Sequence, residues 1–283
     1  MSTAQIIRES IRVLLLHPTR FHSISMLFFS PFTVSLFVSH LIVHHFPHVP
    51  FSTLKFIGHI VGQKGLILPK LLSKTIVHIA ICLPSSVTFS LLGRSATAQA
   101  VSDSYTGISL DGRRLIMRSG SAWVKLLHTS FWESIVVLGL FGALVAILLT
   151  VPKILFSWGI CSRMLGILAV ICCLGIPFCL VFAHVMVVGN LAKVLTVLES
   201  DCSGLESLIK ANNHLKGQRN TALIMALSTN VVLRLVECLF ELRMLTGMSL
   251  WECSLLVSMY SSVLVFDTIL TCVFYYTYKP RNL

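Results

Sequence analysis

Long apolar stretches separated by short polar segments dominate this chain of 283 residues. Charged residues make up only 12% of it, whereas a soluble domain has about 25%. Too little polar surface remains to cover a globule in water, so the composition disfavours a soluble enzyme. Hydrophobic residues reach 55%, which excludes a disordered chain. The composition therefore predicts a multi-pass membrane protein.

Six stretches satisfy the requirement of a membrane-spanning helix for about 20 mainly apolar residues. Pro31, Pro84 and Pro177 fall inside three of them and predict kinks. The expected fold is all-α, a polytopic membrane helix bundle that forms a single integral-membrane domain over residues 1–283. The predicted spans are about 24–44, 75–93, 135–151, 164–188, 221–242 and 255–276.

Lys and Arg are divided unevenly between the two sides that these spans define. About two thirds of the 22 Lys and Arg residues lie in the N-terminal segment, the loops after spans two and four, and the C-terminal tail. These segments share one side, and positive residues accumulate on the cytosolic side of membrane proteins. The chain is therefore expected to keep both termini in the cytosol.

Residues 3–16 form a predicted amphipathic helix ahead of the first span. Ile7 and Ile11 lie on one helical face, and Arg8 and Arg12 lie on the other. Such a helix suits the headgroup layer of the inner leaflet. The alternative is that it packs against the cytosolic end of the bundle.

A second basic amphipathic segment, residues 112–128, precedes the third span. Its apolar residues include Trp123, and they are interleaved with Arg113, Arg114, Arg118 and Lys125. A basic residue near an anionic membrane surface contributes about 1 kcal/mol of attraction, so this segment is a candidate contact with anionic inner-leaflet lipids. The alternative is that these residues only express the positive-inside bias.

The two long cytosolic loops are similar around a glycine. Residues 104–108 (SYTGI) align with residues 201–205 (DCSGL), and the glycine in each, Gly107 or Gly204, is followed six residues later by a basic residue. The match predicts a repeated unit in which the glycine ends a helix in the left-handed conformation. Coincidence is the alternative for so few matches.

Several short motifs resemble a plant family of multi-pass membrane proteins, some members of which are named polyadenylate-binding protein-binding protein. The motifs are residues 5–11 (QIIRESI), 105–107 (YTG), 198–210 (LESDCSGLESLIK) and 215–219 (LKGQR), and the chain departs from the pattern at residues 212–214. The resemblance implies six spans and an unresolved function. A more distant similarity, to membrane regions of some glycerophosphodiester phosphodiesterases, implies no catalysis, because their catalytic domain has no counterpart here.

Four charged residues fall inside the predicted spans, all in the last two: Arg234, Glu237, Glu241 and Asp267. The first three share a helical face, and an axial offset of roughly 6 Å would let Arg234 bridge to Asp267. Charges at this depth cost about 2.5–3.5 kcal/mol each, so we expect them to face the interior and pair. They hold two spans together or, alternatively, line an ion or proton path.

The sequence offers little further chemistry. Cys161 and Cys253 fall in short loops on the non-cytosolic side, where disulfides form, and they are candidates for a bridge. His40, His44 and His48 have helical spacing, but prolines interrupt that helix and no metal site is expected. No catalytic motif or dinucleotide fingerprint is present, so we expect no enzyme activity and no cofactor.

The leading hypothesis is a non-enzymatic membrane scaffold or adaptor whose basic segments contact lipid or a soluble cytosolic protein. Direct binding of nucleic acid is not expected, because the net charge of +11 is explained by membrane orientation. The alternative is a small transporter or channel that uses the charge cluster. The resemblance to plant proteins implies the endomembrane system (ER or Golgi) or the plasma membrane.

Overall fold

The computed structural model describes residues 3–45, 78–107, 112–157, 163–199 and 202–278, and these residues form helices without any strand. Six helical segments are long and apolar enough to cross a membrane, which confirms the predicted fold class. The elements are α1 (Thr3–Leu16), α2 (Pro18–Ile24), the π-helical η1 (Ser25–Phe29), α3 (Ser30–His45), the π-helical η2 (Ser86–Ser90), α6 (Leu91–Thr106), α7 (Gly112–Ser157), α8 (Arg163–Leu198), α9 (Leu205–His214), α10 (Arg219–Thr246) and α11 (Leu250–Tyr278).

Three of the spanning helices extend ten residues or more past an end that the sequence predicted. The second continues to Thr106, the third begins at Leu115 and the fourth continues to Leu198. The predicted bounds ended where charged residues begin. Several of these charged residues are buried and paired inside the protein, so the helices run on past them.

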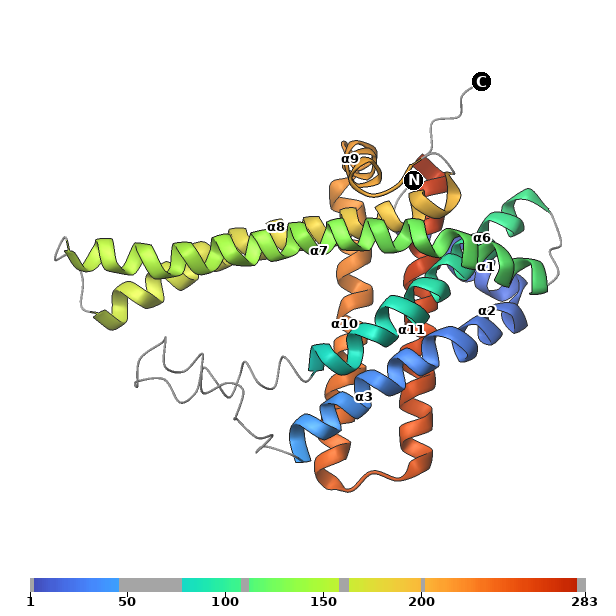
Figure 1. Ribbon diagram of the computed structural model, residues 1–283, viewed down its shortest axis with the longest axis horizontal. Coiled ribbons are helices and arrows are strands. Elements are labelled where there is room, and N and C mark those ends of the chain that lie inside the picture. Colours follow the sequence, from blue (N-terminus) through green and yellow to red (C-terminus); the bar gives the residue numbers. More distant parts are fainter. Residues whose placement is uncertain (1–2, 46–77, 108–111, 158–162, 200–201, 279–283) are drawn as a thin grey trace.

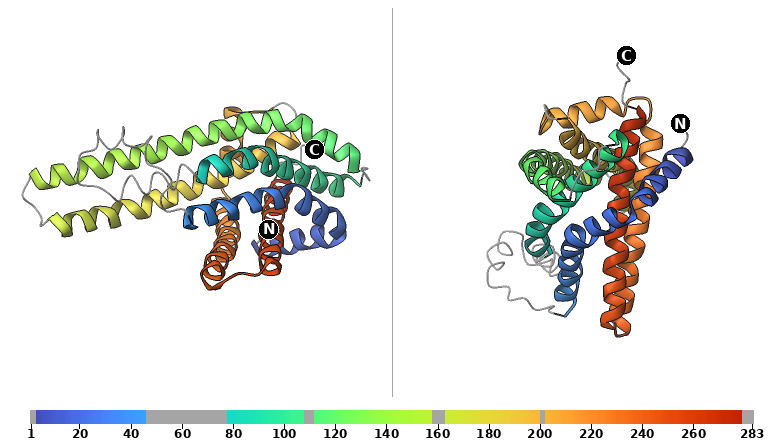
Figure 2. Two further views of the ribbon diagram at one scale, coloured as in Figure 1. Left: turned by 60° about the horizontal axis from the view of Figure 1, so that its bottom comes forward. Right: turned by 90° about the vertical axis from the view of Figure 1, so that its right-hand side faces the viewer.

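The helices form two groups that cross steeply. α10 and α11 run side by side, while α7 and α8 form a long hairpin that projects away from the other helices (Figure 1). Figure 2 shows the same relation from two further sides. The first turn of α1 and the short helix α9 lie toward the C-terminal end of α11 (Figure 1).

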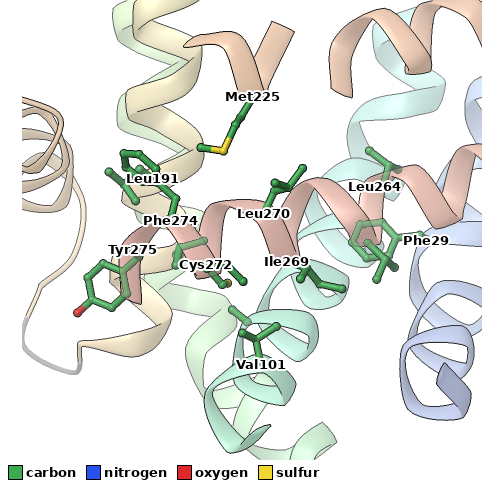
Figure 3. Close-up of a cluster of buried hydrophobic side chains, with 14 of the residues drawn as sticks. Phe29, Val101, Leu191, Met225, Leu264, Ile269, Leu270, Cys272, Phe274 and Tyr275 are labelled. Carbon is green, nitrogen blue, oxygen red and sulfur yellow. The ribbon is translucent and has the colours of Figure 1, made fainter. Parts of the chain in front are cut away.

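The hydrophobic core is centred on α11, which contacts α1, η1, α3, α6, α8 and α10. Ile269, Cys272 and Val273 are completely buried there. Figure 3 shows this cluster, in which α11 side chains meet Phe29 of η1 and Leu191 of α8.

The N-terminal helix α1 packs on α11 with a face different from the one that its sequence suggests. Ile6 and Val13 are buried at 0% and 3% exposure, whereas Ile11 and Leu15 are 43% and 68% exposed. The α1 helix therefore contacts the bundle and also keeps an exposed apolar strip beside its arginines.

Candidate functional site

The four charged residues predicted to form one cluster lie in three different places, and only Arg234 and Glu237 pair with each other. Arg234 Nη1 is 2.6 Å from Oε2 of Glu237 on the same helix, and the Arg234 side chain is 81% exposed. Glu237 also accepts a 2.9 Å hydrogen bond from the Tyr260 hydroxyl. Glu241, which is exposed, lies 3.4 Å from Nδ1 of the half-buried His40. The expectation that all four face inward is therefore wrong for Arg234 and Glu241.

Asp267 is buried in α11 and pairs with Arg94 of α6. Nη2 of Arg94 is 3.8 Å from Oδ2 of Asp267, and Thr229 donates a 2.8 Å hydrogen bond to Oδ1. The other end of the guanidinium, Nη1, donates a 2.9 Å hydrogen bond to Oδ1 of Asn190 in α8. The predicted Arg234–Asp267 pair is wrong, because α6 continues past its predicted end and brings Arg94 into the core.

A second buried ion pair joins α7 to α8. Nζ of Lys193 is 2.6 Å from Oε2 of Glu133, and the two side chains are 13% and 8% exposed. Gly189 provides the space for this carboxylate, since a Cβ at position 189 would lie 2.1 Å from Oε1 of Glu133. Lys193 also interacts electrostatically with the other pair. We call these four residues the junction: Arg94, Glu133, Lys193 and Asp267.

A small cavity lies beside Asp267, with a volume of about 30 Å³. Asn190 and Thr271 are further polar residues of its lining, which is otherwise mostly apolar. This volume holds about one or two water molecules. The junction therefore suits the fixing of helices against each other better than the passage of a solute.

Four of the six predicted basic residues are described at the surface of α1 and α7. Arg8 and Arg12 of α1 are exposed, and Arg12 is 3.7 Å from Glu9. Arg118 and Lys125 of α7 are also exposed. The side chains of Arg113 and Arg114 lie outside the described set. The sequence treated this basic segment and the third span as separate units, whereas α7 is one continuous helix of 46 residues.

Two larger cavities adjoin the basic part of α7. The first, about 290 Å³, lies between α6, α7 and α8, and its polar lining includes Asp103, Arg118 and Lys125. The second, about 280 Å³, lies between α2, α6 and α7, and it is lined mainly by apolar residues together with Arg20 and Asp103. Asp103 is thus shared by a polar cavity and an apolar one.

Gly107 and Gly204 both have positive φ, but they have different roles. Gly107 ends α6 in the left-handed conformation, with φ 70° and ψ 12°. Gly204 precedes α9 with φ 67° and ψ −131°, so it begins a helix and the expected helix-ending role is wrong for it. Its N–H donates a 3.0 Å hydrogen bond to Thr129, and a Cβ there would lie 2.3 Å from the His128 ring.

The short helix α9 is held against α11 by a charged contact outside the spanning segments. Lys210 pairs with Glu199, and Glu199 also accepts a 2.7 Å hydrogen bond from the Tyr275 hydroxyl. The hydrogen bond from Lys210 to Glu199 raises the pKa of the lysine above its ordinary value. The lysine therefore stays charged at neutral pH.

The predicted thiol and histidine groups are only partly described. Cys253 is a half-buried free thiol, and Cys161 lies outside the described residues. His40 contacts His78 at a ring-centroid distance of 5.2 Å, while the side chains of His44 and His48 are not described. Within the described part of the chain, no group of three metal-ligating side chains occurs.

Sequence reasoning missed Arg94, Asp103, Glu133 and Lys193, because it assigned them to loops or loop ends. One signal was available in residues 93–100, a run of small residues around Arg94. Small residues allow close helix packing in membranes, and Ser95, Ala96 and Ala98 are indeed buried.

In the comparison with protein-family models, residues 1–281 match the model of a domain of unknown function (DUF8558). Comparisons with curated proteins and with solved structures gave no match. The match covers nearly the whole chain, which is consistent with the resemblance to an uncharacterised family. The chain therefore belongs to the DUF8558 family.

Proposed function

We propose that this chain is a non-enzymatic multi-pass membrane scaffold that keeps both termini in the cytosol and holds basic helices against anionic lipid. The observation that carries the proposal is the continuity of α7, whose 46 residues extend about 69 Å. A hydrocarbon core is about 30 Å thick. The helix therefore reaches from the apolar span into the basic segment, which is held rigidly at the membrane boundary.

The exposure of the basic side chains supports contact with anionic headgroups. Arg8, Arg12, Arg118 and Lys125 are all exposed, and each contributes about 1 kcal/mol near an anionic surface. A soluble cytosolic protein is the second proposed partner, because the exposed apolar strip on α1 offers it a contact. The resemblance to plant proteins supports the endomembrane system or the plasma membrane as the compartment.

The test uses the full chain reconstituted in bilayers that contain spin-labelled lipids. We expect phosphatidylglycerol to be enriched over phosphatidylcholine in the lipid shell, and we expect salt to weaken this preference. Replacing Arg8, Arg12, Arg113 and Arg114 by Gln should reduce the enrichment. The matched control replaces Lys55, Lys64, Lys70 and Lys74, which the orientation argument places on the other side. Equal enrichment in the arginine variant and the wild-type protein would overturn the proposal.

A small transporter or channel is the alternative, because the junction places two buried carboxylates and two largely buried cations among the spanning helices. The volume of about 30 Å³ beside Asp267 favours the scaffold. Proton and ion flux into proteoliposomes should be measured for Asp267→Asn. The scaffold predicts a lower folded yield and no change of flux per folded protein, whereas altered flux at equal yield supports transport.

A further inference from the structure

The polar cavity between α6, α7 and α8 carries charges of both signs, on walls formed by different helices. Arg118 and Lys125 lie seven residues apart on α7, so they occupy one helical face, and Ser121 and Ala122 line the cavity between them. The cavity volume of about 290 Å³ is close to that of the smaller ligand pockets, which begin near 300 Å³. The α7 wall therefore suits an anionic group such as a phosphate.

The opposite wall, on α6, presents hydrogen-bond acceptors. Gln99 and Asp103 are one helical turn apart and line the same cavity. Oε1 of Gln99 is buried and receives no hydrogen bond from the described residues. Asp103 is 7% exposed. Arg118 and Arg20 interact with its carboxylate electrostatically, but among the described residues no basic nitrogen lies within 4 Å of it, the distance limit of an ion pair. This wall suits a cationic hydrogen-bond donor.

The adjoining apolar cavity extends the site toward α2 and η1. It has a volume of about 280 Å³ and includes Leu27, Phe28, Leu115 and Ile116. Asp103 lines both cavities, and Leu115 of the apolar lining is one helical turn from Arg118 of the polar lining. The glycerol and acyl chains, which are attached at the phosphate, therefore have an apolar surface beside the phosphate position, whereas free phosphate or a free amino acid would leave it empty.

We propose that these two cavities form a binding site for one phospholipid with a primary-amine headgroup, phosphatidylethanolamine. The phosphate lies against Arg118 and Lys125, the ammonium donates to Asp103 and Gln99, and acyl chain carbons occupy the apolar cavity. A choline headgroup has no N–H to donate, and phosphatidylglycerol has no cation for the α6 wall. The inference rests on the proposed contact with lipid and deepens it from a charged surface to one defined site.

Native mass spectrometry of the detergent-purified full chain tests this assignment. Phosphatidylethanolamine, phosphatidylcholine and phosphatidylglycerol with identical acyl chains are titrated separately. We expect one phosphatidylethanolamine per chain, bound at least about tenfold more tightly than the other two, as the loss of a charge-assisted hydrogen bond implies. Equal binding of the three lipids, or tighter binding of phosphatidylglycerol at this site, overturns the proposal.

Cavity variants locate the lipid. Ala122→Trp fills the polar cavity without changing the charge, and Val124→Trp is its control on the same helix, because Val124 is 63% exposed and lies outside the lining. We expect Ala122→Trp to lose the bound lipid and Val124→Trp to keep it. Retained binding in Ala122→Trp contradicts the site.

A second variant, Gln99→Leu, tests the site even if Ala122→Trp does not fold. Gln99→Leu removes the unpaired buried acceptor and should fold at least as well as wild type, while binding phosphatidylethanolamine several-fold more weakly. Unchanged binding in Gln99→Leu overturns the amine assignment. Neither variant alters the arginines used to test enrichment of anionic lipid. Loss of the single site with retained enrichment therefore separates this inference from the proposed function.

Discussion

The junction and the distal part of the α7–α8 hairpin are both built from apolar helices, yet they bury their side chains very differently. The helix α11 contributes Asp267 to the junction, and 61% of the residues in its apolar stretch are buried. In the apolar stretch of α7, only 6% of the residues are buried. The distal hairpin, meaning residues 135–157 of α7 and 163–186 of α8, is joined by aromatic contacts. Phe141 lies 5.5 Å from Phe178 and 5.6 Å from Phe182, and no ion pair joins the described side chains of this part.

This difference indicates what hydropathy does and does not specify in such a chain. Lipid tails are as apolar as leucine, so apolar surface alone gives helices little reason to associate in a membrane. Close packing, hydrogen bonds and ion pairs supply the preference for one arrangement. The junction therefore fixes how the helices cross, while the described side chains of the distal hairpin are exposed or half-buried and leave apolar surface for lipid.

The largest expected effect is the loss of one partner of a buried pair. Lys193→Met leaves Glu133 without its counter-ion and should lower the free energy of unfolding by about 3–5 kcal/mol. Reversible unfolding in mixed micelles measures this change. The double variant Lys193→Met/Glu133→Leu should recover much of the loss, since no unpaired charge remains. Wild-type stability of Lys193→Met would contradict the role of the junction.

A smaller loss is expected where a methyl group intrudes on the same pair. Gly189→Ala places a Cβ against the Glu133 carboxylate and should cost about 1–3 kcal/mol. The control is Gly142→Ala in the distal hairpin, where a Cβ meets nothing within 4 Å. That control should be neutral or stabilising by up to about 1 kcal/mol. Equal effects of the two variants would remove the distinction between the two regions.

Within the distal hairpin, Phe141→Leu should weaken the contact between α7 and α8. The expected cost is about 0.5–1.5 kcal/mol, the contribution of aromatic pairing beyond burial. The midpoint of thermal unfolding in detergent reports the change. A loss as large as that of Lys193→Met would show that the hairpin, and not the junction, dominates stability.

The smallest effect is expected for an exposed ion pair. Arg234→Gln removes the partner of Glu237, but the arginine side chain is 81% exposed and such pairs contribute about 0–1 kcal/mol. Glu237 keeps its hydrogen bond from Tyr260. The same unfolding measurement should therefore place Arg234→Gln close to wild type, and a large loss would count against the observed exposure.

The fold class was predictable because apolar stretches of spanning length are a local property of the sequence. Helix ends were harder to predict. Arg94 and Lys193 resemble loop residues when only their charge is considered, and only the folded chain brings Asp267 and Glu133 to them. A charged residue at the lipid boundary marks the end of a span. Where a partner from another helix neutralises the charge inside the protein, the helix runs on past that residue.

The polar cavity between α6, α7 and α8 was predictable only in part, because its walls come from segments that are distant in the sequence. Arg118 and Lys125 stand out by sequence as basic residues on an amphipathic helix. The acceptors facing them, Gln99 and Asp103, come from a segment that the sequence assigned to a loop, so the cavity could not be predicted. Asp267 was identified as a buried charge, but its partner was not.

The most direct test of the junction is a pair of double-mutant cycles on Asp267, with reversible unfolding in mixed micelles as the measurement. One cycle combines Asp267→Asn with Arg94→Gln, and the other combines it with Arg234→Gln. The structure predicts a coupling energy of about 1–3 kcal/mol for Arg94 and about zero for Arg234. Coupling to Arg234 with none to Arg94 would contradict the observed arrangement and restore the pairing expected from the sequence.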